Sequence, residues 1–227
     1  MFEVISNLDF TPFLLSFKLA SITTFILFVF SLPLAWFLSQ TNSKIKPFLE
    51  ALTALPIVLP PSVLGFYILI ALSQNSPIGM FFENLFGVQL VFSFTGIIVA
   101  SCFYSLPFMV QPLQSGFESL NKNMLEASYI SGKSKIQTVL KVALPNIKPS
   151  LLTAIIVTFA HTVGEFGVVL MVGGSIPEET KVASVAIYEM VEIMDYSTAH
   201  IYSAIMVIIS FLVLLGVYIF NGRLLSK

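Results

Sequence analysis

Two ionisable side chains, His161 and Glu165, lie close together within an otherwise apolar stretch of this sequence. Because they are four residues apart, a continuous helix would present them on one face. Ionisable groups at membrane depth usually face protein or a wet cavity, and they also form proton relays. The spacing does not fit the HExxH zinc motif, and the second histidine, His200, is remote in sequence. Two interpretations stay open: a proton relay, or a Glu165 that is structural or lies near a gate.

A second group of residues, Gly132-Lys133-Ser134, looks like the end of a phosphate-binding loop. That motif needs a glycine five residues before Gly132, where this sequence has Ala127, and a buried strand before it. We therefore expect that the chain does not bind ATP. The single cysteine, Cys102, and the two histidines fall in different segments, so no nucleophile–base pair or metal cluster is evident. We expect no catalytic residue, no metal and no cofactor, and therefore no enzyme.

The elements that carry these residues must lie in lipid. Of the 227 residues, 56% are hydrophobic and only 10% are charged, whereas a soluble domain has about 25% charged residues. A helix needs about 20 apolar residues to cross a bilayer. Five stretches are long enough, at about residues 11–40, 52–72, 94–110, 151–172 and 199–220. We predict an all-α integral membrane protein with a single transmembrane domain over residues 1–227.

Lysines and arginines are distributed unevenly between the two sides of these spans. One side holds nine of the eleven: Lys44, Lys46, Lys122, Lys133, Lys135, Lys141, Lys148, Arg223 and Lys227. The other side holds Lys181 and eight of the twelve acidic residues. Because basic residues are enriched in cytoplasmic loops, we predict that the N-terminus lies outside and the C-terminus in the cytoplasm. Residues 117–148 would then form a cytoplasmic loop.

The second span is unusual for its prolines, Pro56, Pro60 and Pro61, which are followed by Gly65. Each proline removes a backbone donor and bends a helix. In lipid, the freed carbonyl groups must be satisfied by neighbouring protein or by water in a cavity. A simple kink would only shape packing, but three prolines within six residues favour a broken helix beside a pathway.

The polar loop between the third and fourth spans has helix signals of its own. Asn121 is suited to cap a short helix through about Ser131, and Gly132 suits the left-handed residue after it. Ser134 is suited to cap a second helix that ends near Leu144, before Pro145. On the first helix, Met124, Leu125 and Tyr129 are apolar and available to fill a groove in a partner.

The same loop resembles the EAA loop of importer-type ABC transporter permeases. The resemblance is carried by Glu126-Ala127-Ser128, by Gly132 six residues after the glutamate, and by Leu144-Pro145 at the close. It implies that these residues form a coupling helix that seats in a cleft of a cytoplasmic ATPase subunit. It also implies a homodimer of permeases, an external substrate-binding protein, and transport by alternating access through the inner membrane of a prokaryote.

Two further stretches resemble the molybdate permeases within this family. They are residues 55–67, with Pro60-Pro61, and Gly164-Glu165-Phe166-Gly167 with the residues after it. Sulfate and tungstate permeases share part of this pattern, so the resemblance favours molybdate and leaves tungstate and sulfate open. Hydroxyl groups and backbone donors at broken helices are able to pass a divalent oxyanion. Our candidates for the pathway or gate are Pro60, Pro61, Ser62, Thr162, Glu165 and Phe166, with Ser105 beside them.

The alternative interpretation is a secondary transporter driven by protons through His161 and Glu165. The chain has no detectable internal repeat, which argues against it. We expect the lipid bilayer, the ATPase, the binding protein and a second copy of the chain as partners, and no nucleic acid.

Overall fold

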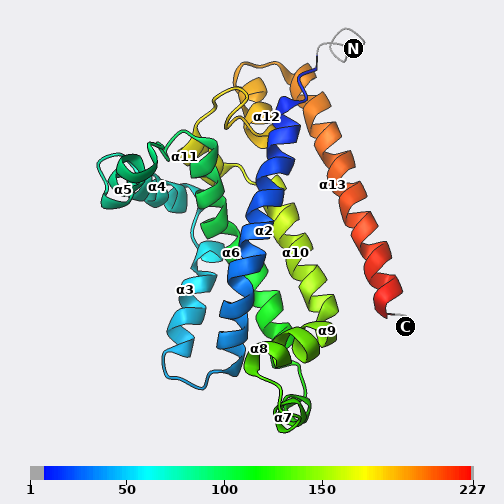
Figure 1. The fold of residues 1–227 in the computed structure, drawn as a ribbon. Coiled ribbons are helices and arrows are strands. Elements are labelled where there is room, and N and C mark those ends of the chain that lie inside the picture. The colour runs from blue at the N-terminus through cyan, green and yellow to red at the C-terminus, as the bar shows by residue number, and fades with distance from the viewer. Residues whose placement is uncertain (1–7, 226–227) are drawn as a thin grey trace.

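Three long helices, α2 (Thr11–Gln40), α6 (Phe94–Glu118) and α10 (Lys148–Val163), lie side by side at the centre of the molecule (Figure 1). The computed structural model describes residues 8–225, and all regular elements in that range are helical. The other helices are α3 (Lys46–Val58), α4 (Pro61–Leu72), α5 (Pro77–Phe86), α7 (Lys122–Ile130), α8 (Lys135–Thr138), the π-helical turn η1 (Val139–Ala143), α9 (Leu144–Asn146), α11 (Gly167–Gly173), α12 (Ala183–Glu192) and α13 (Tyr196–Leu225).

Small side chains allow the central helices to pack closely. Ala35 of α2 and Ala154 of α10 are fully buried in one core cluster, beside Leu113 and Phe117 of α6. Residues of this size let helix backbones approach each other in a membrane, where van der Waals packing supplies much of the association energy. The core therefore fixes the register between helices that carry the candidate site residues.

The candidate spans agree with the predicted ones to different degrees. By length and composition α2, α6 and α13 are each able to cross a membrane, and two bent helix pairs raise the possible number of spans to five among the described residues. The first span begins and ends where predicted. The third continues to Glu118, beyond the predicted end at Val110, and the fifth begins at Tyr196 instead of 199.

The break predicted in the second span is confirmed. Helix α3 ends at Val58 and α4 begins at Pro61, with a bend of 112° between them. Pro60 and Pro61 have no backbone N–H group, so neither is able to continue the ladder of α3. Pro61 instead occupies the first turn of α4, where its missing donor does no harm.

The continuous helix predicted for residues 151–172 is wrong. Helix α10 ends at Val163, and α11 begins only at Gly167. The expectation that His161 and Glu165 share one helix face is therefore also wrong, because the helix ends between them. Gly164 ends α10 with a backbone N–H that donates to the carbonyls of Ala160 and Thr162.

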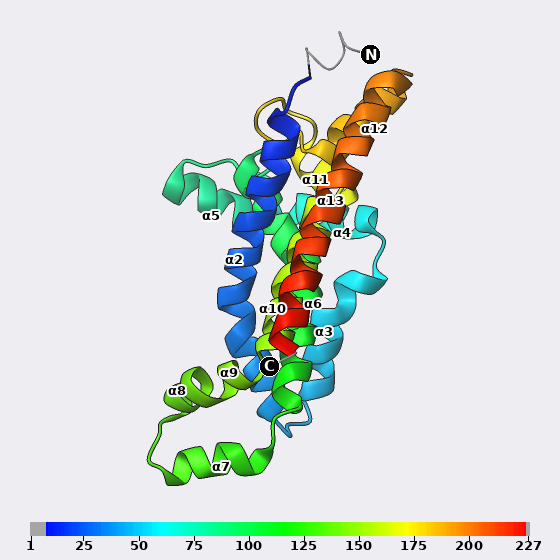
Figure 2. The same cartoon turned by 90° about the vertical axis from the view of Figure 1, so that its right-hand side faces the viewer.

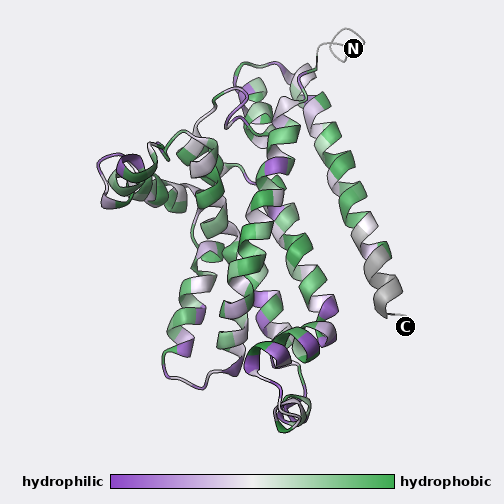
Figure 3. Cartoon of the chain, viewed as in Figure 1, coloured by the Kyte–Doolittle hydropathy of each residue, from purple (hydrophilic) through white to green (hydrophobic). Residues whose placement is uncertain are grey.

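The polar loop forms the lysine-rich end of the molecule (Figure 3). As predicted, the Asn121 side chain caps α7 by accepting from the N–H of Asn123 at 2.9 Å, and Gly132 is left-handed with a φ of 77°. Ser134 and Gln137 form a reciprocal capping box at the start of α8. The two short helices predicted on either side of Gly132 are therefore present.

The predicted end of the second short helix near Leu144 is wrong. The helix passes through η1, includes Pro145 and ends at Asn146, and the chain then bends by 82° into α10. In an α-helix a proline ring clashes with the carbonyl four residues earlier. The wider π turn that directly precedes Leu144 accommodates Pro145, so the bend falls at Ile147 instead.

The segment after α11 forms a cap at the opposite end of the bundle from α7 (Figure 1). A turn over residues 174–182 leads into α12. The N–H of Ala183 donates to Ser16 Oγ of α2 at 2.9 Å, which joins this cap to the central helices. Helix α5 was not predicted; Ser76 caps its start and the left-handed Gly87 ends it.

Candidate functional site

The two helix breaks lie against each other. A Cβ atom placed on Gly167, at the start of α11, would lie 2.8 Å from Pro61 Cβ at the start of α4. One turn further, a Cβ atom on Gly65 would lie 2.8 Å from Met171 Cβ. Only glycine fits at either position, so α4 and α11 pack at a closer distance than other residues allow. The geometry brings the proline-rich break and the Gly164–Phe166 break into one region.

The predicted pathway residues in this region differ in exposure. Pro60, Pro61 and Ser62 are exposed on the surface of the single chain, whereas Phe166 is half-buried. The Phe166 ring packs on Tyr188 of α12, with 4.9 Å between ring centroids. The α3–α4 break is therefore available to a second molecule, a substrate or lipid, while Phe166 already has a partner.

Glu165 is the one buried charged residue in the described part of the chain. It lies between α10 and α11 with 3% of its surface exposed. The buried hydroxyl group of Ser101 on α6 lies beside its carboxyl group, but neither carboxyl oxygen makes a hydrogen bond of ordinary geometry. The backbone carbonyl of Glu165 accepts a hydrogen bond from Ser184 Oγ at 2.5 Å. This bond fixes the backbone and does not involve the carboxyl group. A buried carboxylate without a partner costs several kcal/mol. An ionisable group retained under such conditions in a membrane protein is a functional-site candidate.

Thr162 takes part in a hydrogen-bonded chain between α6 and α10. Its Oγ1 donates to the Thr158 carbonyl at 2.9 Å, so it accepts from Ser105 Oγ, also at 2.9 Å. Ser105 Oγ then accepts from His161 Nδ1 at 2.9 Å, because its own proton is already used. These hydrogen bonds require a proton on Nδ1 of His161.

Aromatic rings of α6 hold His161 in place. The ring of Phe108 stacks on it with 3.9 Å between centroids, and the ring of Tyr104 lies at 4.7 Å. Thr162, 2% exposed, is occupied in packing along with His161. The structure therefore brings Thr162, Ser105 and His161 together. This cluster was not predicted, because it depends on the register between two helices that are distant in sequence.

Helix α7 projects beyond the central bundle and presents most of its surface to solvent (Figure 2). Glu126 and Ala127 are exposed, and Ile130 is 87% exposed. Ser128 is buried instead, with its Oγ 2.9 Å from Thr138 Oγ1 of α8, so it joins the two short helices. Of the predicted coupling residues, Glu126 and Ala127 are free to meet a partner and Ser128 is not.

The structure also shows where other residues of this loop lie. Leu125 is wrong as a residue for a partner groove, because it is 6% exposed and belongs to the main core cluster. A Cβ atom placed on Gly132 would meet no atom within 4 Å. Glycine is therefore favoured at this position only because the backbone is left-handed. Leu144 is half-buried and Pro145 is exposed.

A polar cluster that was not predicted joins α3 to α6 at the same end of the molecule. Lys46 Nζ lies 3.0 Å from Glu118 Oε1 and 3.6 Å from Glu50 Oε1. Gln114 Nε2 donates to Glu50 Oε1 at 2.6 Å and to Glu118 Oε1 at 3.0 Å. The base of the broken second span is thereby held to α6, next to the start of α7.

At the opposite end, Glu189 of α12 makes an ion pair with Lys181 and accepts a hydrogen bond from Ser175. Partial burial by itself would raise the pKa of the Glu189 carboxyl group. The hydrogen bonds from Lys181 and Ser175, with the charge of Lys181, outweigh this effect and hold the pKa below its ordinary value. These contacts fix the turn that follows α11.

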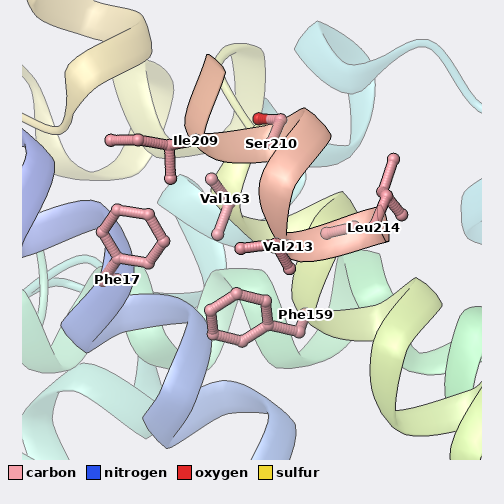
Figure 4. A pocket seen from close by; sticks show the side chains of 8 residues that line it. Phe17, Phe159, Val163, Ile209, Ser210, Val213 and Leu214 are labelled. Carbon is pink, nitrogen blue, oxygen red and sulfur yellow. The ribbon is translucent and has the colours of Figure 1, made fainter. Parts of the chain in front are cut away.

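An apolar pocket of about 180 Å³ separates α13 from α2 and α10 (Figure 4). Phe17, Phe159 and Val213 point into it, and Ser210 is its one hydroxyl-bearing residue. A site for a hydrophilic ion needs several convergent polar groups. This pocket is therefore not a candidate for the pathway.

The sequence matches a known family over most of its length. Residues 20–226 match the model of the "Binding-protein-dependent transport system inner membrane component" family. The chain is 46% identical over 214 residues to the molybdenum transport system permease protein ModB of Azotobacter vinelandii, covering 94% of this chain and 95% of that one. It is 33% identical to a probable sulfate transport system permease protein, cysT, of Chlorella vulgaris, covering 93% and 79% of the two chains.

Solved structures share the fold. A bacterial ABC transporter that imports the acidic polysaccharide alginate superposes with a TM-score of 0.77 at 16% identity, covering 94% of this chain and 78% of that chain. The MetNI methionine ABC transporter superposes with a TM-score of 0.72 at 18% identity, covering 93% and 94%. With its apolar helices, the chain is a multi-pass inner-membrane protein. The chain belongs to the family of binding-protein-dependent transport system inner membrane components, the permeases of ABC importers.

Proposed function

We propose that this chain is the membrane-spanning subunit of an importer that moves an oxyanion, molybdate first and tungstate second, across the inner membrane. The main support for molybdate as the substrate is the 46% identity to a molybdenum permease over nearly the full length of both chains. The weaker likeness to sulfate permeases fits a common class of substrate, the tetrahedral divalent oxyanion. The whole of residues 1–227 forms one permease domain, and residues 117–148 form its cytoplasmic loop.

In this proposal the N-terminus lies outside and the C-terminus lies in the cytoplasm. The lysine-rich end that holds α7 then faces the cytoplasm, in agreement with the enrichment of basic residues in cytoplasmic loops. The exposed Glu126, Ala127 and Ile130 seat α7 in a separate ATPase subunit. Gly132, Leu144 and Pro145 set the shape of the loop, and Ser128 joins its two helices. The permease itself hydrolyses nothing.

The pathway lies where the two helix breaks meet. Pro60, Pro61 and Ser62 supply one wall from the α3–α4 break, and Thr162, Glu165 and Phe166 come from the α10–α11 region. In this proposal a second copy of the chain covers exposed apolar side chains near the first break, among them Val58 and Tyr67, and the pathway runs along the axis of the homodimer. Closure of the ATPase pair on ATP and docking of a loaded external binding protein bias two states of this assembly.

The test is uptake in vesicles that contain the permease with its ATPase, supplied with the external binding protein and labelled molybdate. We expect uptake that requires ATP inside, with tungstate competing and sulfate competing less. Uptake that continues without the ATPase subunit would contradict the proposal.

Proton coupling is the second candidate, and the unpaired carboxyl group of Glu165 is the observation that favours it. Its test is to collapse the proton gradient while ATP is held constant. Uptake lost under that condition would support proton coupling, and uptake retained would exclude it.

A further inference from the structure

A groove of about 350 Å³ lies between the last turns of α2 and the helical segment Lys135–Asn146, which comprises α8, η1 and α9. This volume is within the range of about 300–1,000 Å³ that small-ligand sites occupy. Its lining is almost wholly apolar except at one end: Leu32, Pro33, Trp36, Lys135, Ile136, Val139, Leu140 and Leu144.

The α2 wall of the groove lies near the C-terminal end of a helix that is long and apolar enough to cross a membrane. Trp36 is one turn before the end of α2 at Gln40, and its ring packs edge-on against Phe117 at 5.1 Å. Tryptophan is enriched where hydrocarbon gives way to head groups because its ring is apolar and its N–H is polar. In the orientation given under the proposed function, the groove would open near the cytoplasmic interface of the membrane.

The π-helical turn shapes the other wall. At about 100° per residue, an α-helix would place Leu144 half a turn away from Lys135, nine positions earlier. A π turn holds more residues per turn, so η1 brings Leu144 back toward the face that carries Lys135. Such turns are frequent at functional sites. Ile136, Leu140 and Leu144 recur every fourth residue and would share one face of a plain α-helix, so η1 changes only the position of Lys135 relative to this apolar floor.

Charge and exposure indicate what fills the groove. Ile136 is 72% exposed and Leu140 is 58% exposed, beside lysines and with one acidic residue, Glu126, between positions 119 and 150. A helical segment that exposes apolar side chains among lysines is typical of one that lies on an anionic membrane surface. The helix that projects toward solvent is α7, on the far side of α8 (Figure 2).

We propose that this groove binds an anionic phospholipid of the cytoplasmic leaflet. Its acyl chain lies along Leu32, Pro33 and Trp36, and its phosphate lies against Lys135. The inference rests on the orientation given under the proposed function. A lipid held here fixes the Lys135–Asn146 segment, which joins α7 to α10, and so supports the element through which movement of α7 would reach the helix breaks.

The chain offers a direct probe because Trp36 is its single tryptophan. The full chain is reconstituted in phosphatidylcholine vesicles that contain increasing fractions of brominated phosphatidylglycerol or, separately, brominated phosphatidylcholine. Bromine on an acyl chain quenches tryptophan fluorescence on contact. We expect the brominated phosphatidylglycerol to reach half-quenching at a mole fraction about fivefold lower, as one lysine near an anionic head group predicts.

The decisive variant is Lys135→Gln, and Lys122→Gln on α7 is its matched control, since both lysines are exposed. The first should remove the preference for phosphatidylglycerol, and the second should retain it. Equal quenching by both lipids in the unchanged chain, or equal effects of the two variants, would overturn the proposal. Absence of quenching by either lipid would show that protein covers the groove and would also overturn it. Uptake is not part of this readout, so a failure of the proposed transport function would leave the lipid result intact.

Discussion

At the scale of single residues, the unpaired carboxyl group of Glu165 is the strongest indication of function. The sequence predicts its importance, because an ionisable residue within an apolar span is expensive to bury. The sequence does not show whether the Glu165 carboxyl group has hydrogen-bond partners, because this depends on how α6, α10 and α12 pack around the α10–α11 break. His161 is also an ionisable residue within an apolar span, but the structure shows its ring hydrogen-bonded to Ser105 and stacked on Phe108.

We predict that Glu165→Gln lowers uptake at least tenfold while leaving the free energy of unfolding within about 1 kcal/mol of the unchanged chain. The carboxyl group makes no hydrogen bond of ordinary geometry, with the Ser101 hydroxyl group as its one polar neighbour, whereas breaking a paired buried charge would cost about 3–5 kcal/mol. Thermal unfolding in detergent and uptake in vesicles are measured together. Glu192→Gln, an exposed carboxylate on α12, is the control. A Glu165→Gln protein that unfolds much more easily yet transports normally would show a structural role.

At the scale of elements, prolines cause the break between α3 and α4, whereas glycines allow the break between α10 and α11. The break between α3 and α4 was predictable, since Pro60 and Pro61 are unable to extend a helix. The break after Val163 was not, because no proline interrupts residues 151–172, and glycines such as Gly164 and Gly167 also occur within continuous membrane helices. Its cause is packing: α11 must reach α4 at the distance that Gly167 and Gly65 allow. The π turn before Pro145 was missed because helix signals alone do not distinguish a widened turn from a stop.

We predict that Gly167→Ala destabilises the protein by about 1–3 kcal/mol, the usual range for overpacking. Its Cβ atom would lie 2.8 Å from Pro61 Cβ, and a proline ring has little freedom to move. Gly164→Ala is the matched control in the same break, because its Cβ atom would lie 3.7 Å from the nearest atom. Thermal unfolding of the two variants side by side gives the measurement. Equal stability of both would mean that α4 and α11 do not pack at glycine distance.

The turn between α11 and α12 gives a pH-dependent prediction. Because the folded-state pKa of Glu189 is lowered, its ion pair adds stability above the unfolded-state pKa, and this stability is lost as the pH falls through the folded-state value. The unfolding temperature of the unchanged chain should therefore exceed that of Glu189→Gln at neutral pH, and the difference should shrink as the pH falls below about 4. Glu179→Gln removes an exposed carboxylate of the same turn and should show no such convergence. A difference that stays constant with pH would contradict the ion pair.

At the scale of the whole molecule, the class and the placement of its parts followed from the sequence. The hydrophobic composition predicted helices in lipid. The regular elements of the described residues are all helical, and the family match gives the membrane location. The lysine-rich loop is found at one end of the bundle and the α12 cap at the other (Figure 1). The number of spans and the orientation of the termini stay predictions. The assembly of two copies could not be predicted from the sequence, because the surfaces that would meet a second copy are as apolar as those that face lipid.

The central claim is that α7 couples a separate ATPase to oxyanion transport, and one measurement tests it most directly. Vesicles containing the permease, its ATPase and the external binding protein are assayed for ATP hydrolysis and molybdate uptake, with the unchanged chain and with Ile130→Asp, which places a charge on the most exposed apolar residue of α7. We predict an Ile130→Asp protein that folds normally, loses at least tenfold in uptake, and no longer retains the ATPase. Lys122→Gln at the start of the same helix should retain both. Full uptake by Ile130→Asp would contradict the account.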